Sequence, residues 1–428
     1  MSIKKENPKV DFVKNEHKIL DYWAKNNTFK KLVDKNQNGP KWSFLDGPIT
    51  ANNPMGVHHA WGRTLKDLYQ RYKSMNGFQL RHQNGFDCQG LWVEIEVEKE
   101  LGIKSKKEVE ELGIEKFVNL CKERVEKFSE IQKNQSIRLG YWMDWENSYY
   151  TMSEENNYAI WAFLKKLFED DKIYRGTDVV PWSGRSGTSY SQMEIIEGRK
   201  LTVHKGVFVK FAINEKKNEN ILIWTTTPWT LSSNIAVAVN KKINYAKVQI
   251  EDGTIFYIAE TNLKYQRLNK EFSEKKNWVE GVPKLKTLDQ IFKERGGYKV
   301  LEVVKGQDLI GLTYKGPFDH LEPQNTVGGF PIHDTSNLKK QSAVDCHIVI
   351  DGGKDSEGND MVVEGEGTGF VHMAGGCGAI DNKICKKEGF VEISPIDNQA
   401  NFIEGFGFMS GLSVTDPDTA QKIIDDLK

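Results

Sequence analysis

Residues 47–67 read GPITANNPMGVHHAWGRTLKD, and this stretch determines the fold class that the sequence predicts. A short apolar segment, Trp42–Leu45, precedes it, and we expect that segment to be a β-strand. After the Gly-Pro break and an Asn-rich loop, apolar residues recur at three- and four-residue steps, which predicts a helix that begins near Gly62. The order strand, loop, helix is the first unit of a parallel α/β sheet.

Two adjacent histidines, His58 and His59, stand just ahead of this expected helix. In an open parallel sheet, ligands bind beyond the carboxyl ends of the strands, where a helix N-terminus offers unpaired N–H groups and a positive dipole end. Gly47 and Pro48 permit a close approach of the backbone, and imidazoles can donate to phosphate oxygens. We therefore predict a nucleotide phosphate site. The alternative that the residues leave open is a capped helix with solvent-exposed histidines.

A second candidate segment, NGFDCQGLWVE, covers residues 84–94. Asp87 lies in a Gly-flanked loop at the end of a second predicted strand, where its carboxylate could hold a substrate ammonium group. The alternative is an Asx-type turn, which is common for Asp in such loops. Helical spacing predicts further helices over residues 8–33, 92–135 and 153–171, the last with Ser153 as its N-cap.

From about residue 200 to 395 the sequence consists of short alternating β-type runs. KVQIEDGTIFYI, residues 247–258, predicts a hairpin with an Asp-Gly turn. We expect three regions: residues 1–200 as an α/β domain, 201–395 as a mostly β domain inserted into it, and 396–428 as the tail of the insertion, which ends in a helix.

Two segments of the β-rich region combine hydroxyl groups, an imidazole and a carboxylate. ILIWTTTPWTLSSN, residues 221–234, places three threonines after an apolar strand, and GEGTGFVHMAGGCGAID, residues 365–381, carries His372 and Asp381. Together they could form a hydrolytic pocket without a metal. The alternatives are that Thr is ordinary in strands and that a single strand histidine is usually structural.

The composition limits the cellular setting. Lys plus Arg total 59 and Asp plus Glu 60, so the net charge of -1 neither favours nor excludes a nucleic-acid partner. The five cysteines form no CxxC pair, which argues against a disulfide scaffold and a structural zinc site. There is no apolar run of 18 residues and no apolar signal segment. These features predict a cytoplasmic protein without a membrane partner.

Taken in this order, the segments resemble class I aminoacyl-tRNA synthetases, and most closely the isoleucyl members. Residues 44–67 are similar to the family's GPP-x-A-N-G…HIGH…KD segment, and residues 84–94 to its GWDCHGLPVE. SIRLGYWMDWENSYYTM (136–152) and KLFEDDKIYRGTDVVPWS (166–183) resemble its next two blocks. WTTTPWTLSSN and GTGFVHMAGGCGAID resemble motifs of its inserted editing domain. The resemblance covers nearly the whole chain.

The resemblance implies a fold, an activity and partners. The fold would be the first half of a Rossmann-like parallel-sheet catalytic domain with an inserted mostly-β editing domain. The activity would be ATP-dependent activation of isoleucine, transfer to tRNA(Ile), and hydrolytic editing of valyl-tRNA(Ile). ATP and Mg²⁺ carried with the nucleotide would be the cofactors. A valyl-type synthetase fragment and a stand-alone editing or tRNA-binding protein without ligase activity remain as alternatives.

The resemblance also assigns roles to individual residues. His58 and His59 would be catalytic, and Asp87 would bind the amino acid together with Gly47 and Pro48. The residues implied for ATP binding are Gly56, His58, His59, Gly62 and Lys66. The residues implied for editing are Thr225, Thr226, Thr227, Asn234, His372 and Asp381.

The chain also departs from the family pattern. Where the family has His-x-Gly-His, this chain has Gly56-Val57-His58-His59, so the glycine and the first histidine have exchanged places. PWSGRSG, residues 181–187, lacks the cysteines with which some relatives hold zinc, so we predict no zinc here. No KMSKS-like loop is present, and we expect the chain to be an N-terminal fragment that ends before the second catalytic half. A polypeptide supplying that half is a candidate partner.

Overall fold

The computed structural model describes residues 10–44, 46–198, 204–264, 286–332, 339–354 and 358–428. The chain divides into two compact units, residues 1–175 (unit 1) and 176–428 (unit 2). The domain boundaries expected at residues 200 and 395 stay predictions, and the first of them lies outside the described residues. The elements of unit 1 are α1 (Phe12–Lys25), α2 (Thr28–Lys35), α3 (Val57–Met75), β1 (Gln83–Phe86), α4 (Leu91–Leu101), α5 (Lys106–Leu112), α6 (Ile114–Leu139), β2 (Asp144–Tyr150) and α7 (Glu154–Glu169).

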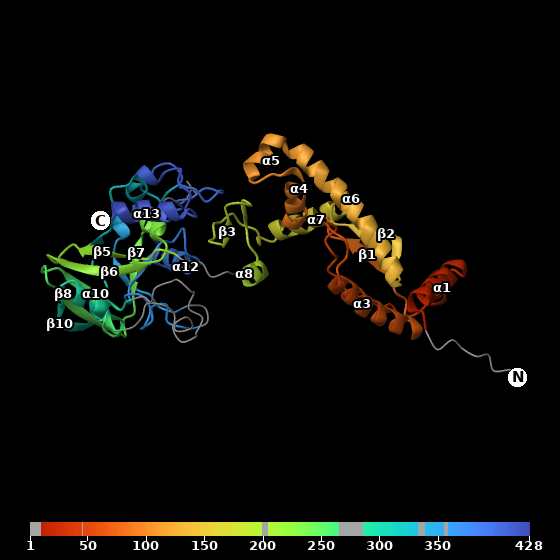
Figure 1. Cartoon of the computed structure of the whole chain (residues 1–428), viewed down its shortest axis with the longest axis horizontal. Helices are drawn as coiled ribbons and strands as arrows, with labels where there is room; N and C mark the ends of the chain where they lie inside the picture. The colour runs from red at the N-terminus through yellow and green to blue at the C-terminus, as the bar shows by residue number, and fades with distance from the viewer. Residues whose placement is uncertain (1–9, 45, 199–203, 265–285, 333–338, 355–357) are drawn as a thin grey trace. The chain divides into compact units, whose positions relative to one another are not determined.

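Unit 1 is built on a parallel pair of strands. β1 and β2 pair with Gly85 opposite Tyr149 and Phe86 opposite Tyr150 (Figure 1). Among the described residues of 41–50, two isolated parallel bridges form with residues on either side of β1, Lys41 with Gln79 and Thr50 with Asp87. The strand expected at Trp42–Leu45 is therefore wrong for its described residues, and Leu45 lies outside them. Between the two bridges, side chains of both segments line a cavity of about 310 Å³ in place of a continuous ladder.

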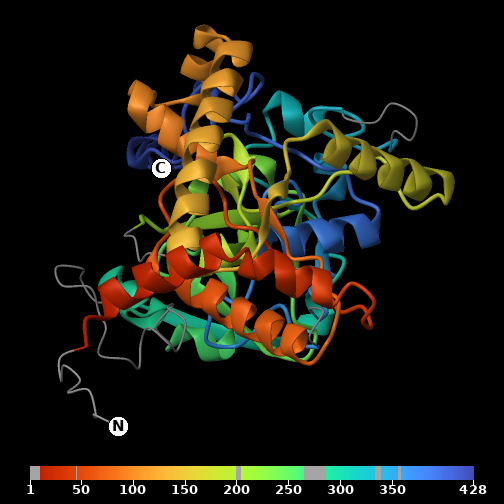
Figure 2. The same ribbon diagram turned by 90° about the vertical axis from the view of Figure 1, so that its right-hand side faces the viewer.

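The helices of unit 1 differ from the predicted ones at two boundaries. The single N-terminal helix expected over 8–33 is two helices, because Asn27 takes a left-handed conformation (φ 50°) that ends the ladder and that Asn tolerates better than most residues. α3 begins at Val57 rather than near Gly62, so His58 and His59 lie in its first turn and not ahead of it. Ser153 caps α7 as predicted, since its side chain accepts from the Asn156 N–H. Figure 2 shows the 26-residue helix α6 in orange to yellow.

Unit 2 is mostly β. Its strands are β3 (Trp182–Ser183), β4 (Thr188–Ser189), β5 (Val207–Ile213), β6 (Glu219–Thr225), β7 (Ala236–Val239), β8 (Asn244–Ile250), β9 (Ile255–Ala259), β10 (Tyr298–Lys305), β11 (Tyr314–Lys315), β12 (Val349–Asp351) and β13 (Val371–Met373). Its helices are α8 (Gln192–Gly198), α10 (Leu288–Glu294), α11 (Glu322–Asn325), α12 (Ala379–Glu388) and α13 (Pro417–Asp426), with short 3-10 turns η1 (Pro228–Ser233), η2 (Glu260–Leu263), η3 (Gly306–Leu309), η4 (Val344–Cys346) and η5 (Gly407–Met409).

Two sheets organise unit 2. One has the strand order β10-β8-β9-β6-β5-β11 and the other β12-β7-β13. The predicted hairpin is confirmed, because β8 and β9 pair antiparallel across a turn that contains Gly253 in a positive-φ conformation. Apolar side chains of both sheets meet in one core, which includes Phe211, Ile223 and Val237. None of the helices in the described part of the chain combines the length and apolar character needed to cross a bilayer.

Candidate functional site

The start of α3 presents backbone donors and an oriented imidazole. The first intrahelical bond runs from the Ala60 N–H to the Gly56 carbonyl, so the N–H groups of residues 57–59 precede the hydrogen-bond ladder. The Gly56 N–H donates to His59 Nδ1 at 3.1 Å. Because Nδ1 accepts, the proton of a neutral His59 ring resides on Nε2. This group can donate to a phosphate oxygen.

The charge state of His59 fits that role. Burial is the main cause that lowers the pKa of His59, and the neighbouring His58, Arg63 and Lys66 lower it further. His59 is therefore neutral at neutral pH. Arg63 and Lys66 follow His59 at helical spacing, so they lie on the same face of α3. Lys66 forms an ion pair with Asp46, which leaves its two remaining ammonium protons for a ligand.

The exchanged glycine and histidine are complementary in space. A Cβ atom built on Gly56 would lie 2.9 Å from Cε1 of His58, so the His58 ring occupies the volume that a side chain at position 56 would need. The His58 and His59 rings are 3.9 Å apart between centroids. Gly62 has nothing within 4 Å of its ideal Cβ, so packing within the chain does not require a glycine there. Both imidazoles thus remain at the mouth of the helix.

The residues predicted to bind the amino-acid substrate lie beside the end of β1. The Asp87 N–H donates to the Ile49 carbonyl at 3.1 Å, and the Ala51 N–H donates to the Asp87 carbonyl at 2.8 Å, so the chain following Gly47 and Pro48 runs alongside Asp87. The Asp87 carboxylate accepts from Thr50 Oγ1 at 2.9 Å and from the Gln89 N–H at 3.4 Å. The second contact is the Asx-type turn considered above. A carboxylate has about four acceptor positions, so an ammonium group can still bind.

The groups that hold this loop could not be predicted from the sequence. Gln132 of α6 donates from Nε2 to the carbonyls of Thr50 and Asn53 at 2.9 Å each. Gln135 accepts from the Met55 N–H at 2.7 Å, and Arg124 donates to the Asn52 carbonyl at 2.6 Å. These partners lie 72 to 82 residues apart, and no local pattern announces such a contact.

In unit 2, three threonines and a histidine form a chain of polar contacts. Thr225 Oγ1 lies 3.3 Å from Thr227 Oγ1, which lies 3.4 Å from Thr230 Oγ1. Thr230 Oγ1 is 3.0 Å from His372 Nε2. The structure thus connects three side chains predicted for editing, Thr225, Thr227 and His372, through Thr230. Thr230 was missed, although Pro228 starts a helical turn that places Thr227 and Thr230 on one side.

Burial shifts the pKa values of His372 and Asp381. Burial lowers the pKa of His372 to about 4, and its Nδ1 is buried without a hydrogen-bond partner. Burial raises the pKa of Asp381, whose carboxylate accepts from the Ala374 N–H at 3.0 Å, two residues after His372. His372 is therefore neutral at neutral pH and can take part in hydrogen bonds as a neutral imidazole.

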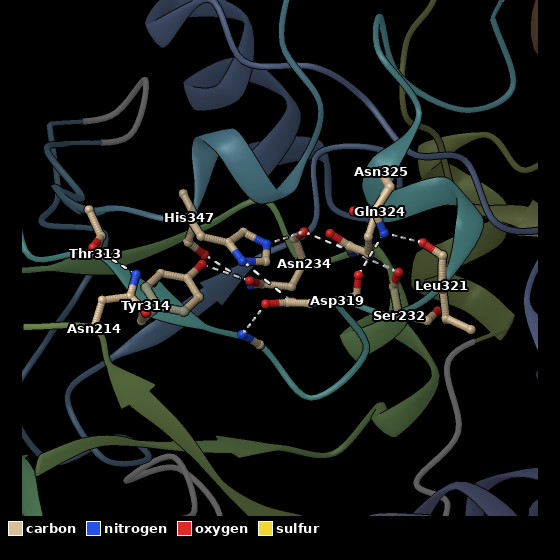
Figure 3. Close-up of polar contacts among 12 residues, drawn as sticks. Asn214, Ser232, Asn234, Thr313, Tyr314, Asp319, Leu321, Gln324, Asn325 and His347 are labelled. Atoms are coloured by element: carbon tan, nitrogen blue, oxygen red, sulfur yellow. Dashed lines mark hydrogen bonds and ion pairs between the residues drawn. The ribbon is translucent and has the colours of Figure 1, made fainter. Parts of the chain in front are cut away.

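The remaining editing candidates are placed differently. Thr226 is exposed, whereas Asn234 is only 1% exposed and belongs to the core. Its side chain accepts from the Tyr314 hydroxyl at 2.7 Å and donates to the Ala236 carbonyl at 3.1 Å (Figure 3). In the described ranges, no group of three or more His, Cys, Asp or Glu side chains is arranged to hold a metal ion. The predicted absence of zinc stays a prediction.

Comparison with known proteins identifies the family. A family model described as "tRNA synthetases class I (I, L, M and V)" matches residues 18–358. The chain belongs to the class I tRNA synthetases. This membership and the parallel pairing of β1 with β2 confirm the predicted α/β fold class.

Individual class I synthetases show the extent of the similarity. The chain is 34% identical to an isoleucine--tRNA ligase of Clostridium tetani over 99% of its length and to one of Sulfolobus acidocaldarius over 98%. These matches cover 35% and 36% of the relatives, so the chain spans about a third of their length. A solved ternary complex of Agrobacterium radiobacter K84 agnB2 LeuRS with tRNA and LeuAMS matches 54% of this chain and 33% of that one, with 14% identity and a TM-score of 0.33.

Proposed function

We propose that this chain is part of a cytoplasmic isoleucine--tRNA ligase that activates isoleucine with ATP for transfer to tRNA(Ile) and hydrolyses valyl-tRNA(Ile). The observation that supports this assignment most directly is the similarity to curated isoleucine--tRNA ligases along almost the entire chain. The same similarity makes isoleucine and tRNA(Ile) the proposed substrates. A separate polypeptide that supplies the rest of the catalytic sheet is a proposed partner.

In the activation step, a carboxylate oxygen of isoleucine attacks the α-phosphorus of ATP, and the bond to the pyrophosphate oxygen breaks. The chain's contribution is positioning and charge stabilisation. Asp87 would hold the ammonium group, and Gly47 and Pro48 would leave room for the backbone of the amino acid. The free N–H groups at the start of α3, His59 Nε2 and Lys66 would bind phosphate oxygens. Mg²⁺ would arrive with the nucleotide and neutralise phosphate charge.

Hydrolytic editing would use unit 2. Isoleucine and valine differ by one methylene, which is worth about 1–3 kcal/mol of discrimination, a limit for which this amino-acid pair is itself the standard example. The linked hydroxyl groups of Thr225, Thr227 and Thr230 would place the ribose and a water molecule. Neutral His372 would donate from Nε2 to Thr230 Oγ1, whose own proton goes to the Thr227 carbonyl at 2.8 Å, and fix the orientation of that chain. Asp381 would bind the ammonium group of the valyl ester.

The first test is isoleucine-dependent exchange of pyrophosphate into ATP by the 428-residue chain. We expect exchange, its loss in Asp87→Asn, and no change in Asp34→Asn, which alters an exposed aspartate of α2. Exchange that depends on valine instead would favour a valyl-type fragment. A folded chain without any exchange would contradict activation by this chain alone, and adding the proposed partner polypeptide would then test complementation.

An editing protein without ligase activity is the second candidate. It is favoured by the location of all six predicted editing residues in unit 2, which is compact by itself. This candidate predicts hydrolysis of valyl-tRNA(Ile) in the absence of any amino-acid-dependent exchange. Affinity for tRNA with neither reaction would identify a binding protein instead.

A further inference from the structure

The loop formed by residues 50–56 joins the two ends of the candidate activation site. At its first residue, Thr50 Oγ1 donates to the Asp87 carboxylate at 2.9 Å. At its last residue, the Gly56 N–H donates to His59 Nδ1 at 3.1 Å, and α3 begins at the next position. The conformation of this loop therefore determines how the carboxylate proposed to bind the ammonium group is placed relative to the helix start proposed to bind phosphate.

One buried side chain of α6 binds this loop at two points. Gln132 is 1% exposed and donates from Nε2 to the Thr50 carbonyl and to the Asn53 carbonyl, at 2.9 Å each. The contacts fix the orientation of the amide, because a flipped amide would place its oxygen against two carbonyl oxygens. Both protons of one amide group thus link two loop residues that are three positions apart.

The acceptor side of the same amide is unused. Oε1 of Gln132 is buried and has no hydrogen-bond partner among the described residues. A buried acceptor without a partner costs free energy, which offsets part of what the two donated bonds contribute to stability. The Thr50 carbonyl also accepts from the Asn52 N–H at 3.0 Å, so it would keep a partner without Gln132. The glutamine therefore contributes little to folding, and its main effect is on the geometry of the loop.

A second glutamine extends this control to the α3 end of the loop. Gln135 lies three residues after Gln132, on the same face of α6, and accepts from the Met55 N–H at 2.7 Å. Pro54 lies between the two points of contact, and its ring fixes its own φ angle. A change in the position of the Gln132 amide would therefore be passed along the loop to the start of α3.

We propose that Gln132 is a positioning residue for adenylate formation. It fixes the placement of Asp87 relative to the first turn of α3, so that a carboxylate oxygen of the bound amino acid can bond to the α-phosphorus of ATP as the bond to pyrophosphate breaks. The amide acts through the loop and needs no contact with either substrate. The proposal deepens the proposed activation function and rests on it.

A positioning role has a specific kinetic signature. Each substrate is held at one end of the loop, by groups that remain when the Gln132 amide is removed. The step that needs both substrates in register is the one that suffers, and a misplacement of about 1 Å costs about a hundredfold in rate. The kcat should therefore fall, while the KM for isoleucine and the KM for ATP stay nearly constant.

The test measures isoleucine-dependent pyrophosphate exchange by the 428-residue chain carrying Gln132→Met. This change keeps the length of the side chain and removes both N–H donors. We expect kcat per folded molecule to fall about 10- to 100-fold and both KM values to change less than about threefold, with the folded fraction taken from near-ultraviolet circular dichroism. An unchanged kcat, or a loss of activity that lies entirely in KM, would overturn the proposal.

Asn134→Ala is the matched control on the same helix. Asn134 is exposed, and its amide donates to Glu130, one helical turn earlier, at 3.1 Å. Removing this amide should leave kcat and both KM values as in the wild type. A loss of kcat as large as that of Gln132→Met would assign the effect to α6 in general and contradict a specific role of Gln132.

Amide hydrogen exchange tests the same inference without catalysis. In Gln132→Met, exchange in a peptide of residues 49–56 should become about tenfold faster or more, while a peptide of residues 114–131 keeps its wild-type rate. If exchange in residues 49–56 is unchanged, Gln132 does not fix the loop and the inference is wrong. If the wild type shows no pyrophosphate exchange, activation by this chain alone fails, and the amide exchange still decides whether Gln132 sets the loop geometry.

Discussion

The hydrogen bonding and charge of the histidine side chains in this chain depend on their surroundings. His58 and His59 are neighbours in sequence, yet His58 is exposed, whereas the ring of His59 is oriented by the hydrogen bond that its Nδ1 accepts from the Gly56 N–H. His372 is held neutral by burial, and its Nδ1 has no hydrogen-bond partner in the described part of the chain. The three imidazoles therefore differ in exposure and hydrogen bonding, and each difference follows from the surroundings of the ring.

The lowered pKa of His372 predicts a pH-dependent stability. Because its folded-state pKa of about 4 is below the ordinary value of about 6.5, the unfolded chain binds this proton more tightly. The contribution of His372 is complete above about pH 6.5 and is lost as the pH falls toward about 4. Between about pH 7 and pH 5 the loss should be about 2 kcal/mol. Urea unfolding at both pH values should show this loss in the wild type and not in His372→Gln. If the unfolding free energies of both proteins change equally between the two pH values, the prediction is contradicted.

Because Gly56 and His58 have exchanged places, we predict that substitutions at these two positions have coupled effects on stability. Gly56→His alone should destabilise α3 by about 1–2 kcal/mol and weaken ATP binding, because its Cβ meets the His58 ring. The double change Gly56→His with His58→Gly removes the obstructing ring and should recover most of both losses. A double-mutant cycle on unfolding free energy measures the coupling. Additive effects would show that the His58 ring simply moves aside.

At the scale of elements, β1 and β2 depend on a glycine. A Cβ on Gly85 would overlap the ring of Tyr149 on the paired strand, and both residues lie in the only parallel strand pair that the described part of unit 1 contains. Gly85→Ala should therefore lower the unfolding free energy of unit 1 by about 2 kcal/mol. Gly62→Ala is the matched control, since its Cβ meets nothing and a helix gains up to about 1 kcal/mol from this change. If Gly62→Ala also weakens ATP binding, Gly62 is needed for the ligand. If the Gly85→Ala chain has the same unfolding free energy as the wild type, the Tyr149 ring moves aside without an energetic cost.

Elements with local signals were predictable from the sequence, and those with distant partners were not. The Asp252-Gly253 turn and the Ser153 cap are local, and both are confirmed. The early start of α3 was missed because its cap partner is the ring of His59 rather than a Ser, Thr or Asp side chain. The role of Thr230 depends on a contact with a residue 142 positions away. Hydrophobic periodicity carries no information about such contacts.

At the scale of the whole molecule, apolar burial is divided unequally. The main core of unit 2 joins side chains from β5 to α13, including Phe211 and Ile423. The clusters of unit 1 are smaller, such as the group around Phe86 and Val125. Since stability and its urea dependence both grow with buried apolar area, the two units should differ in resistance to denaturation.

We therefore expect two urea transitions, with unit 1 unfolding at the lower concentration. Hydrogen exchange read by mass spectrometry at increasing urea assigns each transition, because peptides of residues 83–150 and of residues 207–259 report on different units. Gly85→Ala should move only the first transition, and His372→Gln at about pH 5 should move only the second, toward higher urea, because it removes the cost of a buried titrating ring. A single transition that both variants shift equally would mean that the units unfold together. Unit 2 would then not fold independently. That result would contradict the proposal of an editing protein that acts without activating an amino acid.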